Sequence, residues 1–300
     1  MDIKSTILKE KQARGVTILA HTYQTPDILE IADFAGDSFA LAQEALRSPA
    51  DTVMVCGVRF MAETVKILSP EKRVIIPAPA ATCPMAEQIT PDDIAAVRAQ
   101  HPDVYVCCYI NTTAELKTAC DMCVTSSSAE RILRAVPNKK ILFVPDKNLG
   151  AYLAAKLPEK EFILLNGCCP VHDKVTAEDV LAAKALYPNA KLAVHPECRP
   201  EVIALADFVG ATSAIIDYAI SGHNEVLIGT ERGVYDQLVI KHKGTVFHQL
   251  CMEKLVCDDM KLTTTETVLT ALRGEGGETV HLSAELISRA RVCLDAMLNA

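Results

Sequence analysis

The segment 21–38, HTYQTPDILEIADFAGDS, recurs along the chain, and this repeat constrains the fold more than any other feature. It aligns without a gap with 195–212, HPECRPEVIALADFVGAT, and six of the 18 positions are identical. A weaker match, 109–126, keeps an aspartate and a serine in register. Because an internal repeat decides the architecture, we predict three copies of a unit of about 87 residues. Positions that stay polar in every copy are candidates for one shared site.

Short apolar segments alternate with helical segments of about ten residues, a pattern typical of α/β units with parallel sheets. No Gly/Ser linker or charge block separates the copies, so we expect three homologous α/β domains packed around a pseudo-threefold axis. The expected domains are repeat 1 (1–82, packed with the C-terminal segment 262–300), repeat 2 (83–168) and repeat 3 (169–261). Ligands bind at the carboxyl ends of parallel strands, so three converging ends predict a central active site.

The expected elements follow the same order in each copy. The predicted strands are 16–21, 33–38, 52–57, 73–77, 104–109, 123–125, 140–146, 162–166, 191–195, 207–211, 225–231 and 245–250. The predicted helices include 2–13, 60–68, 89–100, 148–156, 177–186, 213–220, 233–241 and 283–298. Asp33, Asp121 and Asp207 open equivalent short strands, and we interpret them as structural turn or capping residues.

Composition limits the partners and the compartment. A formal net charge of −8 and the absence of Trp argue against nucleic acid as a partner. No apolar run reaches about 18 residues, so no membrane span is expected. The first 15 residues read as a polar amphipathic helix and not as a secretory signal. Twelve cysteines in such a chain indicate the reduced cytoplasm, where cysteines serve as metal ligands, catalytic groups or small core residues.

One cysteine recurs at the same place in each copy. Cys83 in ATCPMA, Cys169 in GCCPVH and Cys257 in LVCDDMK have matching positions, and the residues after them also align. Three equivalent thiolates near a pseudo-threefold axis suit a soft metal site. Zinc would prefer a fourth protein ligand, whereas a four-iron cluster on three cysteines keeps one iron open as a Lewis acid. The alternative is three small buried residues, which the shared register disfavours.

The other nine cysteines give weaker signals. Cys120 and Cys123 form a C-x-x-C motif, but their repeat partners are alanines, which favours small core residues over a redox pair. Cys168 adjoins Cys169 and is the alternative ligand to it. Cys251 raises a similar question beside Cys257.

Polar residues also recur at strand ends and at expected helix starts. The sets are His21, Tyr109 and His195; Tyr23, Asn111 and Glu197 two residues later; and Ser38, Ser126 and Thr212. Hydroxyls and free N–H groups at helix N-termini bind carboxylate or phosphate, although simple capping is the alternative. His and Glu supply general acid–base groups. Two equivalent histidines with Tyr and Glu nearby therefore favour a shared site over isolated core residues.

Several motifs together resemble the quinolinate synthase family, the A protein of NAD biosynthesis, over nearly the whole chain. They are HTYQ, IADFAGDS, ATCPMA, YINTTAE, PDKNLG, GCCPVH, HPEC and the GAT of 210–212. The resemblance implies three α/β domains and a [4Fe–4S] cluster held by three cysteines. It implies condensation of iminoaspartate with dihydroxyacetone phosphate to quinolinate, with release of phosphate and water. Such an enzyme is a cytoplasmic transferase, and a partner enzyme that supplies unstable iminoaspartate fits this chemistry.

The resemblance also implies roles, motif by motif. The implied cluster ligands are Cys83, Cys169 and Cys257. The implied catalytic residues are Tyr23, Glu197, His21 and His195. The implied substrate-binding residues are His21, Ser38, Tyr109, Asn111, Ser126, His195, Glu197 and Thr212. Two positions depart from the family pattern: Cys168 stands where His is frequent, and Ala211 where Ser is frequent, which removes one anion donor.

Two other classes of function compete with this interpretation. An electron-transfer iron–sulfur protein would hold a cluster without catalysing a reaction, but it would normally use four ligands. A structural zinc protein would show tetrahedral zinc on the same cysteines. Catalysis is favoured because His, Tyr and Glu recur beside the cysteines.

Overall fold

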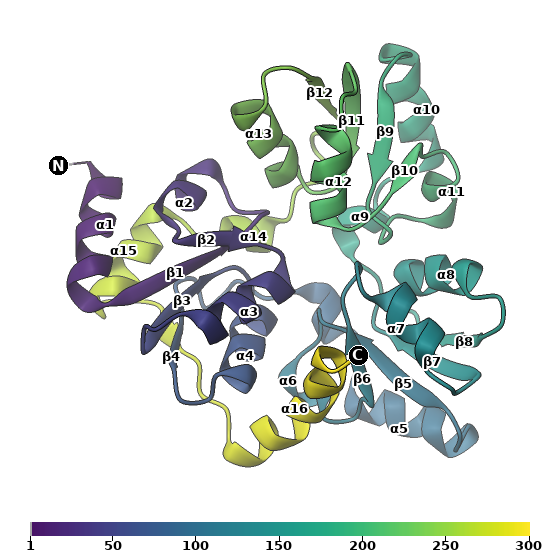
Figure 1. The fold of residues 1–300 in the computed structure, drawn as a ribbon, viewed down its shortest axis with the longest axis horizontal. Coiled ribbons are helices and arrows are strands. Elements are labelled where there is room, and N and C mark those ends of the chain that lie inside the picture. The colour runs from purple at the N-terminus through teal and green to yellow at the C-terminus, as the bar shows by residue number, and fades with distance from the viewer. Residues whose placement is uncertain (1) are drawn as a thin grey trace.

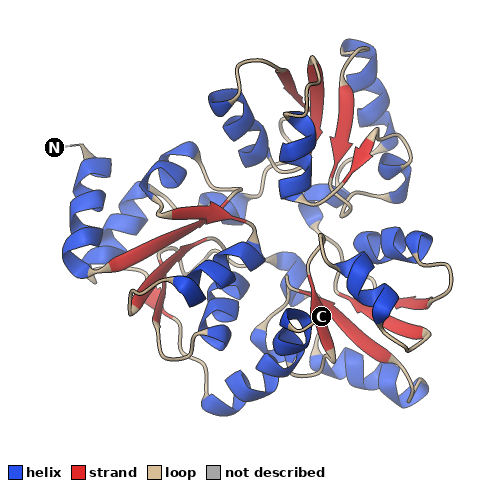
Figure 2. Cartoon of the chain, in the orientation of Figure 1, coloured by secondary structure: helices blue, strands red, loops and turns tan. Residues whose placement is uncertain are grey.

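The computed structural model describes residues 2–300, which form three lobes around a common centre, each built on one β-sheet (Figure 1). Helices cover the sheets in every lobe (Figure 2). The architecture is α/β with three mostly parallel sheets, as the sequence predicts. No helix within residues 2–300 is both long and apolar enough to cross a bilayer.

The three sheets share one strand order, in which the first strand of each lobe lies between the second and the third. Sheet 1 contains β1 (Val16–His21), β2 (Phe34–Gly36), β3 (Thr52–Cys56), β4 (Arg73–Ile76) and, at its edge, β13 (Glu278–Thr279). Sheet 2 contains β5 (Tyr105–Tyr109), β6 (Met122–Val124), β7 (Lys140–Val144) and β8 (Glu161–Leu164). Sheet 3 contains β9 (Lys191–Val194), β10 (Phe208–Val209), β11 (Glu225–Gly229) and β12 (Val246–Gln249). The strand order reverses at β1, β5 and β9, where parallel sheets place their ligand sites.

Helices connect these strands in each lobe. Lobe 1 has α1 (Ile3–Arg14), α2 (Pro26–Ile31), α3 (Ser38–Arg47) and α4 (Arg59–Leu68). Lobe 2 has η1 (Pro84–Glu87), α5 (Pro91–Gln100), α6 (Ala114–Lys117), α7 (Ala129–Ala135) and α8 (Lys147–Lys156). Lobe 3 has α9 (Pro170–Asp173), α10 (Ala177–Leu186), α11 (Pro200–Ile203), α12 (Thr212–Ala219) and α13 (Arg232–Lys241). The chain ends with α14 (Asp258–Lys261), α15 (Thr265–Arg273) and α16 (Ala284–Leu298).

One aspartate in each lobe fastens the second strand to the first. Its carboxylate accepts the N–H of a residue on the first strand, with distances of 2.8, 2.8 and 3.0 Å for Asp33 to Ile18, Asp121 to Val106 and Asp207 to Leu192. The N–H of the same aspartate donates to the carbonyl of the same partner. The aspartates are therefore structural residues, which confirms their interpretation from the sequence.

The C-terminal segment is packed against lobes 1 and 2. Helix α15 packs on α1, where Ile7 is fully buried beside Val268 and Leu272. Strand β13, which is not among the predicted strands, pairs antiparallel with β4 at the edge of sheet 1. A parallel neighbour of β4 would need a crossover connection from β4, and β13 instead follows α15 directly, so it can pair in the antiparallel direction. Helix α16 packs on β6, α6 and α4. The division of the chain at 82, 168 and 261 stays a prediction.

Candidate active site

A cavity lies where the carboxyl ends of the first strands of the three sheets face the centre. His21 ends β1, Tyr109 ends β5 and His195 follows β9. The cavity wall includes all twelve residues singled out from the sequence: His21, Tyr23, Ser38, Cys83, Tyr109, Asn111, Ser126, Cys169, His195, Glu197, Thr212 and Cys257. Cys168 and Cys251 are not among the described residues that line it.

The three recurring cysteines have the same local structure. Each directly precedes a short helix: η1 follows Cys83, α9 follows Cys169 and α14 follows Cys257. The backbone N–H of the third residue after each cysteine favours its thiolate and partly offsets the effect of burial on its pKa. Burial raises the pKa of Cys83 to about 12 and that of Cys257 to about 11, and raises that of Cys169 well above its usual range. Without a metal, all three are therefore neutral thiols.

A histidine that the repeat does not reveal joins two of the predicted residues. His172 Nδ1 lies 2.9 Å from Glu197 Oε2 and 3.3 Å from Cys169 Sγ, and these three side chains could hold a metal ion. Burial favours neutral Glu197, but nearby His195 and hydrogen bonds with His172 and Tyr109 prevail and lower its pKa to about 2. Glu197 is therefore a buried carboxylate at neutral pH.

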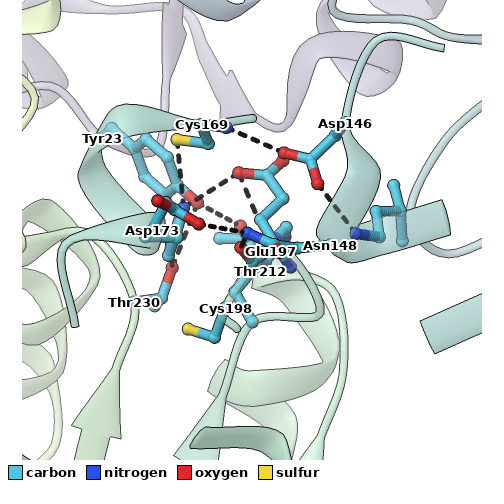
Figure 3. A network of polar contacts seen from close by, with 12 residues as sticks. Tyr23, Asp146, Asn148, Cys169, Asp173, Glu197, Cys198, Thr212 and Thr230 are labelled. Atoms are coloured by element: carbon cyan, nitrogen blue, oxygen red, sulfur yellow. Dashed lines mark hydrogen bonds and ion pairs between the residues drawn. The ribbon is translucent and has the colours of Figure 1, made fainter. Parts of the chain in front are cut away.

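Hydrogen bonds link Tyr23 to this group across two lobes (Figure 3). Its hydroxyl lies 3.1 Å from both Thr212 Oγ1 and Thr230 Oγ1. His172 Nε2 lies 3.0 Å from the same Thr230 oxygen, so a continuous path runs from Tyr23 to Glu197. Burial, then the charge of Glu197, raises the pKa of Tyr23 well above its ordinary value. The phenol is therefore protonated and can act as a proton donor.

Comparison with known proteins decides the family. The profile of a family described as "Quinolinate synthetase A protein" matches residues 5–299. The chain belongs to this family. It is 43% identical over 298 residues to a quinolinate synthase of Caldicellulosiruptor bescii, covering 99% of this chain and 98% of that protein. Quinolinate synthases of Aquifex aeolicus and Clostridioides difficile are 45% and 41% identical, with 98% and 99% of this chain and 91% and 97% of those proteins covered.

In this member of the quinolinate synthetase A family, the three recurring hydroxyls do not cap helices, which was the alternative to anion binding. Asp37 caps α3 by accepting N–H groups, and Ser38 is the first residue of the helix. Thr212 is likewise the first residue of α12. Ser126 lies before α7, which begins only at Ala129. All three residues line the cavity.

Two buried acidic side chains hold the backbone of two of the recurring cysteines. Asp146 accepts the N–H of Cys169 at 2.9 Å, and Glu231 accepts that of Cys257 at 3.2 Å. Burial, and then the charge of Glu197, raises the pKa of Asp146 to about 8. Repeat comparison missed both acids because lobe 1 has Val58 at the same helix-capping position. The only sequence signal for Asp146 and Glu231 was an acidic residue close before a predicted helix.

Both predicted histidines are neutral at pH 7. Burial, followed by the charge of Lys261, lowers the pKa of His21 to about 3. Burial also lowers the pKa of His195 to about 4. Neither ring is therefore a cation in the folded protein. Nδ1 of His21 and of His195 accepts a backbone N–H, so Nε2 of each neutral ring carries the hydrogen and can donate a hydrogen bond.

These histidines predict a stability that falls in acid. Between pH 6.5 and 4.5 the unfolded chain binds protons that the folded chain excludes, so stability rises with pH there. Each histidine contributes a slope approaching ~1.4 kcal/mol per pH unit. Asp146 has a raised pKa, so its contribution to stability falls as the pH rises, opposite to that of the histidines. This contribution is present in the wild type and in the variant below, so the comparison between them still reports on the histidines. Urea unfolding of metal-free protein should show a smaller loss in the variant His21→Gln/His195→Gln than in wild type. Equal losses would mean that the histidines are already charged.

Proposed function

We propose that this chain is a quinolinate synthase that condenses iminoaspartate with dihydroxyacetone phosphate and releases phosphate and water. The reaction is a step of NAD biosynthesis, carried out by a transferase that forms a C–C bond and then promotes cyclisation and dehydration. The relatives' names support the activity. One observation carries the proposal: three repeat-equivalent cysteines share a cavity with Tyr23 and Glu197.

The three cysteines fit a [4Fe–4S] cluster. They supply sulfur donors from the segments after β4, β8 and β12, and a backbone N–H near each sulfur favours the thiolate form that such a cluster requires. The carboxyl groups of Asp146 and Glu231 fix the backbone of two of the cysteines. When bound, the cluster supplies an open iron that acts as a Lewis acid toward substrate oxygen or nitrogen.

The protein's own groups account for the proton transfers. Forming the C–C bond requires an enamine, so a proton must leave the carbon beside a carboxylate of iminoaspartate. Glu197 is ionised and buried, which supports its proposed role as the acceptor of this proton. His172 and Thr230 connect it to Tyr23 by hydrogen bonds. Tyr23, kept protonated by burial, can donate to a leaving oxygen during isomerisation or dehydration.

Neutral polar groups are proposed to orient the substrates. The hydroxyls of Ser38 and Thr212 lie at the starts of α3 and α12, and at α12, which no described side chain caps, free N–H groups favour phosphate and carboxylate. Asn111 Oδ1 is buried without a hydrogen-bond partner, so it can receive an N–H of the imine or enamine. Tyr109 and Ser126 complete the wall beside it.

The chemistry also indicates where the protein works. Iminoaspartate is unstable in water, so we propose that an enzyme supplying it acts together with this one. Twelve unpaired cysteines suit the reducing cytoplasm.

An anaerobic assay tests the proposal. Protein reconstituted without air should contain about four iron atoms per chain and form quinolinate from iminoaspartate and dihydroxyacetone phosphate. Cluster-loaded protein that forms no quinolinate would refute the function. Redox cycling without product would favour an electron carrier. One zinc on Cys169, His172 and Glu197, with no iron bound, would favour a zinc protein.

A further inference from the structure

Tyr23 lies on the loop after β1, yet side chains from beyond lobe 1 hold the carbonyl groups of this loop. Gln237 Nε2 of α13 donates to the carbonyl of Thr22 at 2.7 Å. Lys261 Nζ, at the end of α14, donates to the carbonyl of Tyr23 itself. At the start of α13 a Cβ on Gly233 would lie 2.8 Å from the Tyr23 carbonyl oxygen, so no larger residue fits without a backbone shift. The position of Tyr23 thus depends on residues remote in sequence.

A buried carboxylate fixes the ammonium group of Lys261. Glu231 is fully buried, and its Oε1 lies 3.0 Å from Lys261 Nζ. The same oxygen accepts the N–H of Cys257 at 3.2 Å, while Oε2 accepts that of Gly233 at 2.7 Å. A buried ion pair keeps a fixed geometry when additional hydrogen bonds satisfy its atoms, as here. One carboxylate therefore connects the third cysteine, the start of α13 and the lysine that holds Tyr23.

We propose that Lys261, oriented by Glu231, is a positioning residue for Tyr23. Lys261 is not among the described residues that line the cavity, so it acts through the Tyr23 carbonyl and not on substrate. With this carbonyl held, the phenol stays 3.1 Å from Thr212 and Thr230. The inference rests on the proposed function, which gives Tyr23 its proton transfers.

The repeat partner of Tyr23 is held in a similar way. Asn148 Nδ2 of α8, in lobe 2, donates to the carbonyl of Glu197 in lobe 3 at 3.1 Å. Its amide also donates to Asp173 Oδ1 at 2.9 Å, which fixes its orientation. The main chain of both proposed catalytic residues is thus held by a side chain from outside their own lobe. This parallel favours a positioning role for Lys261 over an incidental contact.

Kinetics of the cluster-loaded enzyme provide the first test. Lys261→Met should lower kcat by about 10- to 100-fold, because small misplacement of a reacting group has effects of this size. KM and iron content should stay close to wild type, and Lys261→Arg should recover most of kcat. Lys254→Met is the matched control, since Lys254 pairs with Asp179 at 2.6 Å in lobe 3 and does not contact Tyr23.

A second variant separates positioning from a general structural role. In a Tyr23→Phe background, Lys261→Met should cause little further loss of kcat, because both changes act through the same phenol. Losses that multiply in the double variant, or a change confined to KM, would overturn the proposal.

Hydrogen exchange tests the same contact without any activity. In metal-free protein, Lys261→Met should accelerate amide exchange in a peptide covering 22–25 by about tenfold or more, whereas Lys254→Met should not. Unchanged exchange would overturn the positioning role even if quinolinate is formed. Faster exchange in a protein that forms no quinolinate would refute the proposed function and leave the contact established.

Discussion

Glu197→Gln should reduce kcat for quinolinate formation by about 10²- to 10⁴-fold, the range expected for loss of a general base. Glutamine keeps the size of the side chain and can still bond to His172 and Tyr109, but it cannot accept a proton. Anaerobic steady-state kinetics would measure the effect. The iron content should not change, because the proposed ligands are three cysteines.

Glu225→Gln is the matched control for this variant. Glu225 also pairs with a histidine, His248, at 2.7 Å, but neither residue is among those that line the cavity. Its replacement should leave kcat near the wild-type value. A Glu197→Gln enzyme that retains kcat within about tenfold would assign the proton transfer to another group.

Cys169→Ser should abolish the cluster, while the neighbouring Cys168→Ser should retain about four iron atoms per chain. The reason is orientation: Cys169 lines the cavity with the other two recurring cysteines, and Cys168 does not. The N–H of Cys168 instead donates to Gln88 Oε1 at 2.7 Å. Iron analysis and the visible absorption of anaerobically reconstituted protein would measure cluster content.

The adjacent cysteines provide their own control, since both variants make the same chemical change one residue apart. Quinolinate formation should be lost only with Cys169→Ser. Cluster loss in the Cys168 variant alone would reverse the assignment, and retention in both variants would exclude each as a required ligand.

Repeat comparison predicted what the three lobes have in common. The alternation of apolar and helical segments predicted the strands, and the recurring aspartates predicted a structural residue at the start of each second strand. It also predicted a shared cavity, because equivalent strand ends must meet when equivalent lobes pack around one centre. The residues at those strand ends could be identified from the repeat alone, without knowing which lobes are in contact.

The missed residues are those that break the symmetry. His172 is equivalent to Ala86 and Met260, so no repeat signal marks it. Lys261 and Thr230 contact Tyr23, which lies on a loop of another lobe. Their roles depend on contacts between lobes, which a local sequence pattern cannot predict. The four-residue helices are too short for periodicity to predict. An asymmetric substrate needs differences between the lobes, and comparison of similar segments hides these differences.

The contact between α1 and α15 has a consequence for biosynthesis. The ribosome releases the N-terminus first, so the apolar side of α1 around Ile7 is present long before Val268 and Leu272 exist to cover it. The outer edge of β4 also stays open until β13 is made, and an open edge strand invites wrong pairing. Lobe 2 also receives a helix, α16, from the C-terminal segment, but all the strands of its sheet are consecutive in the chain. Lobe 1 is therefore translated first and completed only when the end of the chain returns to it.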